Sequence, residues 1–142
     1  AGVFRMILTE TDDLAACHAL RRAVFIEEQG IAEAEEWDDL DGQAVHLLAR
    51  EGDTPLGTAR LFVEGTEGRI GRVCVAKPAR GTGLGAALIR EGVARLAAVG
   101  CTRILLGAQC YAIPFYEKLG FTAVGPEYDD AGIPHREMER RL

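Results

Sequence analysis

The hydrophobic and polar positions in the first quarter of the chain predict a strand followed by a helix. Residues Val3–Leu8 are rich in β-branched and aromatic side chains, which is typical of a strand. Apolar residues then recur at helical spacing from Leu14 to about Glu28. Thr11 is the candidate N-cap of this helix and Gly30 its candidate end.

The next part of the chain predicts three strands joined by tight turns. Val45–Arg50, Leu56–Val63 and Arg69–Ala76 are strand-like, and clusters of turn residues separate them. Such short connections favour an antiparallel meander. The segment before these strands, residues 31–42, is acidic. We expect it to be a solvated loop, with attraction of a cationic amine as the alternative.

The pattern then changes to alternating strands and helices. A glycine-rich loop over residues 80–85 leads into a helix whose apolar residues share one face, with Gly100 as its candidate C-cap. A strand at Arg103–Gly107 follows, and the order strand, helix, strand predicts a parallel crossover. The remaining residues predict a short helix, a strand, a turn-rich loop and a last strand, at Ile113–Leu119, Phe121–Val124, 125–134 and His135–Leu142. We therefore expect one α+β domain spanning residues 1–142.

Charge and cysteine content exclude several classes of protein. The net charge of −6 disfavours nucleic acid as a partner, because a basic face supplies most of that affinity. No apolar run approaches the ~20 residues needed to cross a bilayer, and no leader segment opens the chain, so we expect no membrane partner. The cysteines lack the spacing of zinc modules. We expect buried, reduced thiols of a cytoplasmic protein, and no metal.

The glycine-rich loop is the strongest chemical signal, because a strand–loop–helix junction of this kind favours phosphate binding. A P-loop is excluded, since Gly83-Leu84-Gly85 stands where Gly-Lys-Ser/Thr is required. A dinucleotide site is satisfied formally by Gly81, Gly83 and Ala86, but residues 101–110 lack the acidic residue that binds the ribose. A dinucleotide-dependent oxidoreductase therefore remains a weaker alternative to the pyrophosphate of coenzyme A.

Two segments carry a resemblance to a known family. Arg80–Gly85 resembles the R/Q-x-x-G-x-G/A loop of GNAT-type N-acetyltransferases, and Ala112–Phe121 resembles the A-x-x-F-Y-E-K-x-G-F segment of that family. The order of elements matches over nearly the whole chain. Further matches resemble the ElaA/YjcF-like branch, at Arg22–Gln29, Asp41 with His46, Ala108-Gln109 and Gly132–His135.

The resemblance implies a GNAT-like fold, with antiparallel N-terminal strands leading into a parallel pair that splays around the coenzyme. It also implies acetyl-CoA as co-substrate and direct transfer of the acetyl group to a primary amine of a small molecule or peptide. The implied coenzyme-binding residues are Val73, Cys74, Val75, Arg80, Gly81, Thr82, Gly83, Leu84, Gly85, Ala86, Gln109 and Ala112. The backbone N–H of Val75 is the implied donor to the thioester oxygen.

The catalytic residues are less clearly marked. Tyr116 is the candidate general acid toward the departing thiolate, although it could simply pack beside Phe115. Glu28 and His46 are the leading candidates for the general base, with His135 or a water relay as alternatives. A domain that binds acyl-CoA without turnover is the second functional hypothesis. A homodimer through the last strand is also expected.

Overall fold

The computed structural model describes residues 6–142, and its centre is one mixed sheet. The strands lie in the order β1-β2-β3-β4-β5-β8-β6, and β7 pairs with β8. Residues 3–5 of the first predicted strand lie outside the described residues. The strands are β1 (Met6–Thr11), β2 (Val45–Glu51), β3 (Thr54–Glu64), β4 (Glu67–Val75), β5 (Arg103–Gln109), β6 (Thr122–Ala123), β7 (Tyr128–Asp130) and β8 (Ile133–Arg141).

The first predicted helix differs from the structure in its cap and in its second half. Asp13 is the N-cap, because its side chain accepts a hydrogen bond from the Ala16 N–H at 3.1 Å, whereas the Thr11 hydroxyl accepts from the Asp13 N–H. The helix continues beyond its α-helical part as a π-helix. The helical segments are α1 (Leu14–Arg21), the π-helix η1 (Arg22–Glu28), α2 (Glu33–Glu36), α3 (Leu84–Ala98) and α4 (Ile113–Glu117), with 3₁₀ turns η2 (Asp41–Gln43), η3 (Lys77–Ala79) and η4 (Cys110–Ala112).

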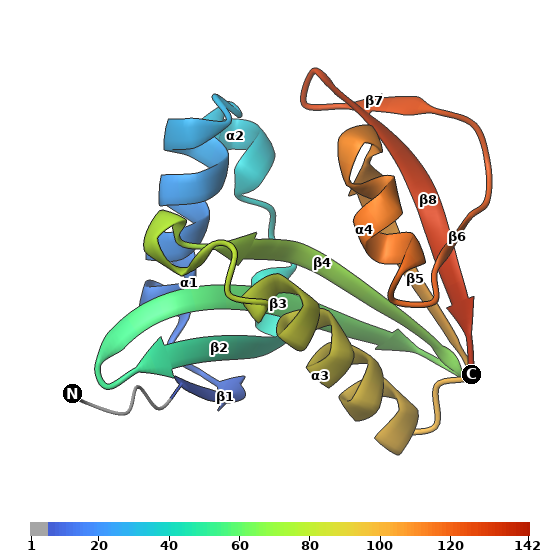
Figure 1. The fold of residues 1–142 in the computed structure, drawn as a ribbon, viewed down its shortest axis with the longest axis horizontal. Coiled ribbons are helices and arrows are strands. Elements are labelled where there is room, and N and C mark those ends of the chain that lie inside the picture. The colour runs from blue at the N-terminus through green and yellow to red at the C-terminus, as the bar shows by residue number, and fades with distance from the viewer. Residues whose placement is uncertain (1–5) are drawn as a thin grey trace.

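Helices cover both faces of the sheet (Figure 1). Side chains of a strand alternate between the two faces, so neighbouring residues of β2 enter different cores. Leu47 packs in the core beneath α3, where Leu88 and Ile89 are fully buried. Leu48 packs in the second core, with Leu20 of α1. The apolar side chains of β2 therefore pack into two cores, one on each face of the sheet.

The two halves of the sheet separate between β4 and β5. These strands run parallel and pair only between Glu67–Arg69 and Arg103–Leu105. Beyond that point they diverge, as the gap between the green β4 and the orange β5 shows (Figure 1). The rest of β4 thus has an edge that β5 does not pair with. The predicted antiparallel N-terminal strands and splayed parallel pair are confirmed.

A β-bulge lies on β4 where the strands part. Ala59 of β3 stands opposite both Arg72 and Val73, because the register shifts between Thr58 and Arg60. Arg72 has a φ of 50°, which is uncommon for a residue other than glycine. The bulge turns this part of β4 at the point where the sheet opens.

One strand appears where the sequence predicted a turn-rich loop. β7 occupies part of residues 125–134 and pairs antiparallel with β8. Its residues include two aspartates, which have low strand propensity, so the local pattern did not indicate it. Tyr128 is aligned with His135 in this pairing.

Candidate active site

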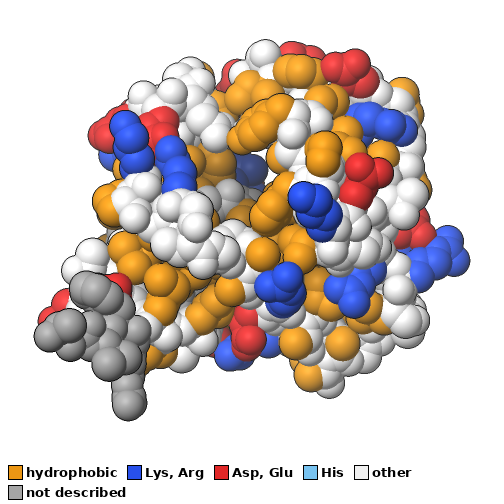
Figure 2. Space-filling view, in the orientation of Figure 1, with side chains coloured by type: hydrophobic (Ala, Val, Ile, Leu, Met, Phe, Trp, Pro, Cys, Tyr) orange, Lys and Arg blue, Asp and Glu red, His pale blue; other side chains and the backbone are white. Residues whose placement is uncertain are grey.

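A cleft of about 330 Å³ occupies the opening between the two halves of the sheet. Val73 of β4 lines one wall and Gln109 of β5 lines the other. Tyr116 of α4 and His135 of β8 lie on the β5 side, and Phe25 of η1 reaches the cleft from the β4 side. Figure 2 shows the surface hollowed between the helical segments of the N-terminal half and the C-terminal strands.

The glycine-rich loop has the backbone conformation that glycine permits. Gly81 and Gly83 have φ values of 79° and 85°, in the left-handed region. Gly83 is the N-cap of α3, and the first N–H to bond back to it is that of Ala87, at 3.0 Å. The N–H groups of Leu84, Gly85 and Ala86 therefore lack partners inside the helix. Together with the helix dipole they favour a phosphate group at this end of α3.

Other residues of the loop have structural contacts. The Thr82 hydroxyl donates to the Ala79 carbonyl. Leu84 is buried in the core beneath α3. A Cβ on Gly85 would lie 3.5 Å from the Phe115 ring, an ordinary contact, so Gly85 has room for a methyl group. A conformational requirement for glycine therefore holds at positions 81 and 83, where φ is positive.

Arg80 is already engaged, and its partner is the first base candidate. Its Nε donates to the Val75 carbonyl at 3.1 Å, and its Nη1 lies 2.8 Å from Oε2 of Glu28. This hydrogen bond lowers the pKa of Glu28. A carboxylate held in its charged form is a weak base, and Glu28 does not line the cleft. The structure therefore places Glu28 beside the glycine-rich loop and not in the cleft, where the base was expected.

The end of β4 directs one backbone N–H to the open edge of the sheet. The Ala76 N–H donates to the Leu56 carbonyl at 2.7 Å. Along an antiparallel strand, the backbone N–H and C=O groups of successive residues point alternately toward the partner strand and away from it. Because Ala76 bonds to β3, the N–H and carbonyl of Val75 point away from β3. Cys74, between Val73 and Val75, faces the opposite core and is 4% exposed. Burial raises the pKa of its thiol to about 12, so it is inert as a nucleophile.

Tyr116 combines aromatic packing with exposure to the cleft. Its ring packs edge-on against Phe115 and Phe121, with centroids 5.0 and 6.2 Å away. Burial, and secondarily Tyr111, raises the pKa of Tyr116 to about 12. Within residues 6–142 its hydroxyl makes no hydrogen bond. It is therefore a protonated donor that lines the cleft with no partner of its own.

Gln109 links the two walls of the cleft. Its Nε2 donates to Oε1 of Gln29 at 3.0 Å. Gln29 follows directly after the π-helix η1, and Glu28, its neighbour, holds Arg80. The end of η1 thus contacts both the phosphate loop and the end of β5. Ala112, the last coenzyme-binding residue that the resemblance implied, also lines the cleft.

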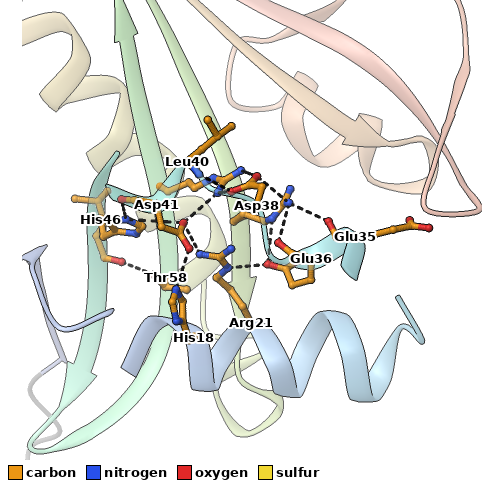
Figure 3. A network of polar contacts seen from close by, with 12 residues as sticks. His18, Arg21, Glu35, Glu36, Asp38, Leu40, Asp41, His46 and Thr58 are labelled. Carbon is orange, nitrogen blue, oxygen red and sulfur yellow. Dashed lines mark hydrogen bonds and ion pairs between the residues drawn. The ribbon is translucent and has the colours of Figure 1, made fainter. Parts of the chain in front are cut away.

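His46, the second base candidate, lies outside the cleft. It is 4% exposed, and its Nε2 is 2.9 Å from the carbonyl oxygen of Asp41. Figure 3 shows it at the edge of a polar network beside Asp41 and Thr58. A buried imidazole bonded to the backbone in this way has a structural role.

Glu36, Asp38 and Asp41 of the acidic segment belong to that network, so the expected solvated loop is only partly right: the other acidic side chains of the segment are exposed. Glu36 is 2% exposed, and its Oε2 accepts hydrogen bonds from Arg21 at 2.7 Å and from Arg72 at 3.1 Å. Two guanidinium nitrogens of Arg60 donate to the carboxylate of Asp38, at 2.7 and 2.6 Å. Buried carboxylates require such partners. The network therefore fastens the segment against α1 and β4.

Asp41 is the second anchor of the network. Its Oδ1 accepts from Arg21 at 2.8 Å and from Arg60 at 3.0 Å, and its Oδ2 lies 2.9 Å from His18 Nε2. Burial alone would raise the pKa of Asp41, but these hydrogen bonds outweigh it and hold the pKa well below its usual value. Sequence reasoning missed all three arginines, because each lies far along the chain from its partners.

Comparison with known proteins decides the family. Residues 12–142 match the model of the acetyltransferase (GNAT) domain. The chain belongs to the GNAT acetyltransferase family. The uncharacterized N-acetyltransferase YjcF of Bacillus subtilis is 32% identical over 134 residues, which covers 94% of this GNAT chain and 96% of YjcF. The crystal structure of an acyl-CoA N-acyltransferase from Pseudomonas aeruginosa has a TM-score of 0.84 at 31% identity, covering 97% of this chain and 99% of that one.

A further relative places this GNAT domain in the expected branch. Escherichia coli ElaA is 32% identical over 139 residues, which covers 91% of this chain and 88% of ElaA. Its crystal structure has a TM-score of 0.82 and covers 98% of this chain and 100% of that one. The resemblance to the ElaA/YjcF-like branch is confirmed.

Two further observations concern metal and membrane. Residues 6–142 contain no group of three or more His, Cys, Asp or Glu side chains arranged to hold a metal ion. In the same residues, no helix has the length and apolar character to cross a membrane.

Proposed function

We propose that this GNAT domain transfers the acetyl group of acetyl-CoA to a primary amine by direct attack. The observation that carries the proposal is the cleft at the β4–β5 divergence, which Tyr116 lines, together with the phosphate-favouring start of α3, where Gly85 lies beside Phe115 of α4. A thioester coenzyme needs both features, one for its pyrophosphate and one for its reacting end. Use of coenzyme A agrees with the family and with the acyl-CoA N-acyltransferase that shares the fold.

The chain holds the coenzyme by backbone groups and one arginine. The pantetheine arm, rich in amides, pairs with the open edge of β4 as an added strand would. The N–H of Val75 donates to the thioester oxygen as negative charge develops there. The pyrophosphate binds the free N–H groups at the start of α3. Arg80 binds the phosphate when its guanidinium leaves the carboxylate of Glu28.

Tyr116 supplies a proton to the sulfur that leaves. Its raised pKa keeps the hydroxyl protonated across the neutral range, so the donor is always present. The C–N bond forms as the C–S bond breaks, the sulfur takes a proton from the hydroxyl, and the nitrogen loses one. The proton lost by the amine balances the proton gained by the thiol.

The proposal is tested by thiol release from acetyl-CoA with a panel of primary amines, for the wild type and for Tyr116→Phe. We expect Tyr116→Phe to lower kcat by about 10²-fold, because one hydroxyl donor is lost while the aromatic packing is kept. The dissociation constant for acetyl-CoA should not change. Equal turnover of both proteins would contradict the role of Tyr116.

The alternative function is an acyl-CoA-binding module without turnover. It is supported by the placement of Glu28 and His46, because neither is among the residues that line the cleft. Acetyl-CoA binding by the wild type without thiol release for any amine would favour this alternative.

A further inference from the structure

We propose that His135 is the general base that takes the proton from the amine, an inference that rests on the proposed acetyl transfer. The chain has three histidines, and the structure describes all of them. His18 and His46 belong to the network around Asp41. Only His135 lines the cleft, the same cleft that Tyr116 lines.

A hydrogen bond to the backbone fixes the protonation of one ring nitrogen of His135, and this determines the protonation of the other nitrogen. Nδ1 lies 2.7 Å from the carbonyl oxygen of Ile133. A carbonyl oxygen can only accept, so Nδ1 carries the hydrogen and donates it. In the neutral ring Nε2 then holds the lone pair, which is the state that a base requires. Within residues 6–142 Nε2 has no hydrogen-bond partner, so it is free for a substrate.

The ring of His135 is held in place by Tyr128. The two rings stack with centroids 5.7 Å apart and an interplanar angle of 27°. Tyr128 in turn lies across β5 at Gly107, where an added Cβ would be 2.5 Å from its hydroxyl oxygen. Only glycine at this position of β5 leaves room for that arrangement. The strand β7, which local sequence patterns did not predict, thus orients the imidazole through Tyr128.

His135 also lies on the correct face of the sheet. It is aligned with Gln109 across the β5–β8 pairing, and aligned residues share a face. Gln109 lies at the end of β5 and lines the cleft. His135 is therefore on the wall opposite β4, whose open edge binds the thioester in the proposed function.

The charges in the cleft suit an amine that arrives as a cation. Arg60, Arg69 and Arg72 line the cleft, but each is paired with a carboxylate. The side chains of Glu35 and Asp130 also line it, and within residues 6–142 neither makes a hydrogen bond or ion pair. The unpaired charge is thus negative, which attracts an ammonium group. The ammonium must lose a proton before it attacks, so a base in this cleft is needed.

The proposed step balances in atoms and charge. The ammonium gives a proton to Nε2 of His135, and the neutral amine forms the C–N bond as the C–S bond breaks. The nitrogen loses its second proton to water as the amide forms, and the sulfur gains a proton from Tyr116. Water returns a proton to the Tyr116 phenolate, and the imidazolium of His135 releases its proton to solvent, so that one proton is released for each ammonium acetylated.

The test compares two nucleophiles in the variant His135→Asn. The Asn amide nitrogen can still donate to the Ile133 carbonyl, so the backbone contact is kept and only the basic nitrogen is lost. The first probe is an alkyl amine, namely whichever of tyramine, putrescine, glucosamine and Ala-Gly the wild type acetylates fastest. The second probe is hydroxylamine, which is already unprotonated at neutral pH. We expect kcat/KM with the alkyl amine to fall by about 10²-fold or more, and the rate with hydroxylamine to change only a few-fold.

The control is His18→Gln, a half-exposed histidine outside the cleft, which should leave the ratio of the two rates unchanged. His135→Gln is a second variant in case the first does not fold. Equal losses with both nucleophiles would overturn the assignment, because a structural fault does not distinguish between them. Failure of the proposed function is a separate outcome, because the wild type would then transfer acetyl to none of the probes, whether or not it binds acetyl-CoA in calorimetry. An active wild type with equal losses in the variant overturns the role of His135 alone.

Discussion

At the scale of single residues, the structure pairs Glu28 with Arg80, which changes the role expected for Glu28 from the sequence. Glu28 follows the apolar helical pattern and precedes Gln29, which made it a candidate base. In the fold its carboxylate neutralises the arginine of the phosphate loop. A carboxylate that competes with a phosphate for the same guanidinium weakens phosphate binding. In the proposed function, we therefore expect Glu28 to affect the affinity for the coenzyme and not the rate of proton transfer.

We expect Glu28→Gln to bind acetyl-CoA several-fold more tightly and to retain turnover with the amine substrate. Arg80→Ala should bind about tenfold more weakly or worse, because a hydrogen bond to a charged group is worth about 1.5–3 kcal/mol. Calorimetry and thiol release measure the two quantities separately. A loss of kcat of about 10²-fold in Glu28→Gln at unchanged affinity would show that Glu28 is the base after all.

At the scale of elements, the buried network joins α1 and the acidic segment to β3 and β4. Arg72 belongs both to the network and to the β-bulge, where its backbone has a positive φ. Its Nη2 also donates to the Glu36 carbonyl at 3.1 Å. These contacts hold the bulge in its unusual conformation, next to Val73 in the wall of the cleft. The network thus supports the wall of the cleft, which Glu36, Arg60 and Arg72 also line.

We expect Asp41→Asn to destabilise the protein by about 1.5–3 kcal/mol at pH 7, because Arg21 and Arg60 each lose one of their two carboxylate partners. The folded-state pKa of Asp41 lies below its usual value of about 3.9. The ionised carboxylate therefore stabilises the fold above about pH 4, and this contribution is lost as the pH falls further. Urea unfolding of wild type and variant should show a difference that shrinks toward pH 3.

The matched control for this prediction is Asp39→Asn, since Asp39 is exposed and lies in the same segment. It should change the free energy of unfolding by less than about 0.5 kcal/mol at either pH. A pH-independent loss in Asp41→Asn would contradict the ionic role of the carboxylate.

At the scale of the whole molecule, local patterns predicted most of the fold. The meander, the loop before α3 and the crossover to β5 follow from periodicity and from glycine positions that are adjacent in sequence. The buried network does not, because Arg60 and Arg72 are remote from Glu36 and Asp38 in the chain. The strand β7 does not follow from local patterns either, because its aspartates have low strand propensity. The contact of Tyr128 with Gly107 joins residues that are remote in the sequence. Candidates for coenzyme binding were found by motif, whereas the placement of the bases required the fold.

The measurement that tests the central claim most directly is calorimetric titration of the protein with acetyl-CoA, CoA, NADH and ATP in parallel. The account predicts micromolar binding of acetyl-CoA and CoA, and a weaker affinity for acetyl-CoA in Arg80→Ala. No binding of acetyl-CoA, or a preference for NADH, would contradict it. That result would return the glycine loop to a dinucleotide or a purely structural role.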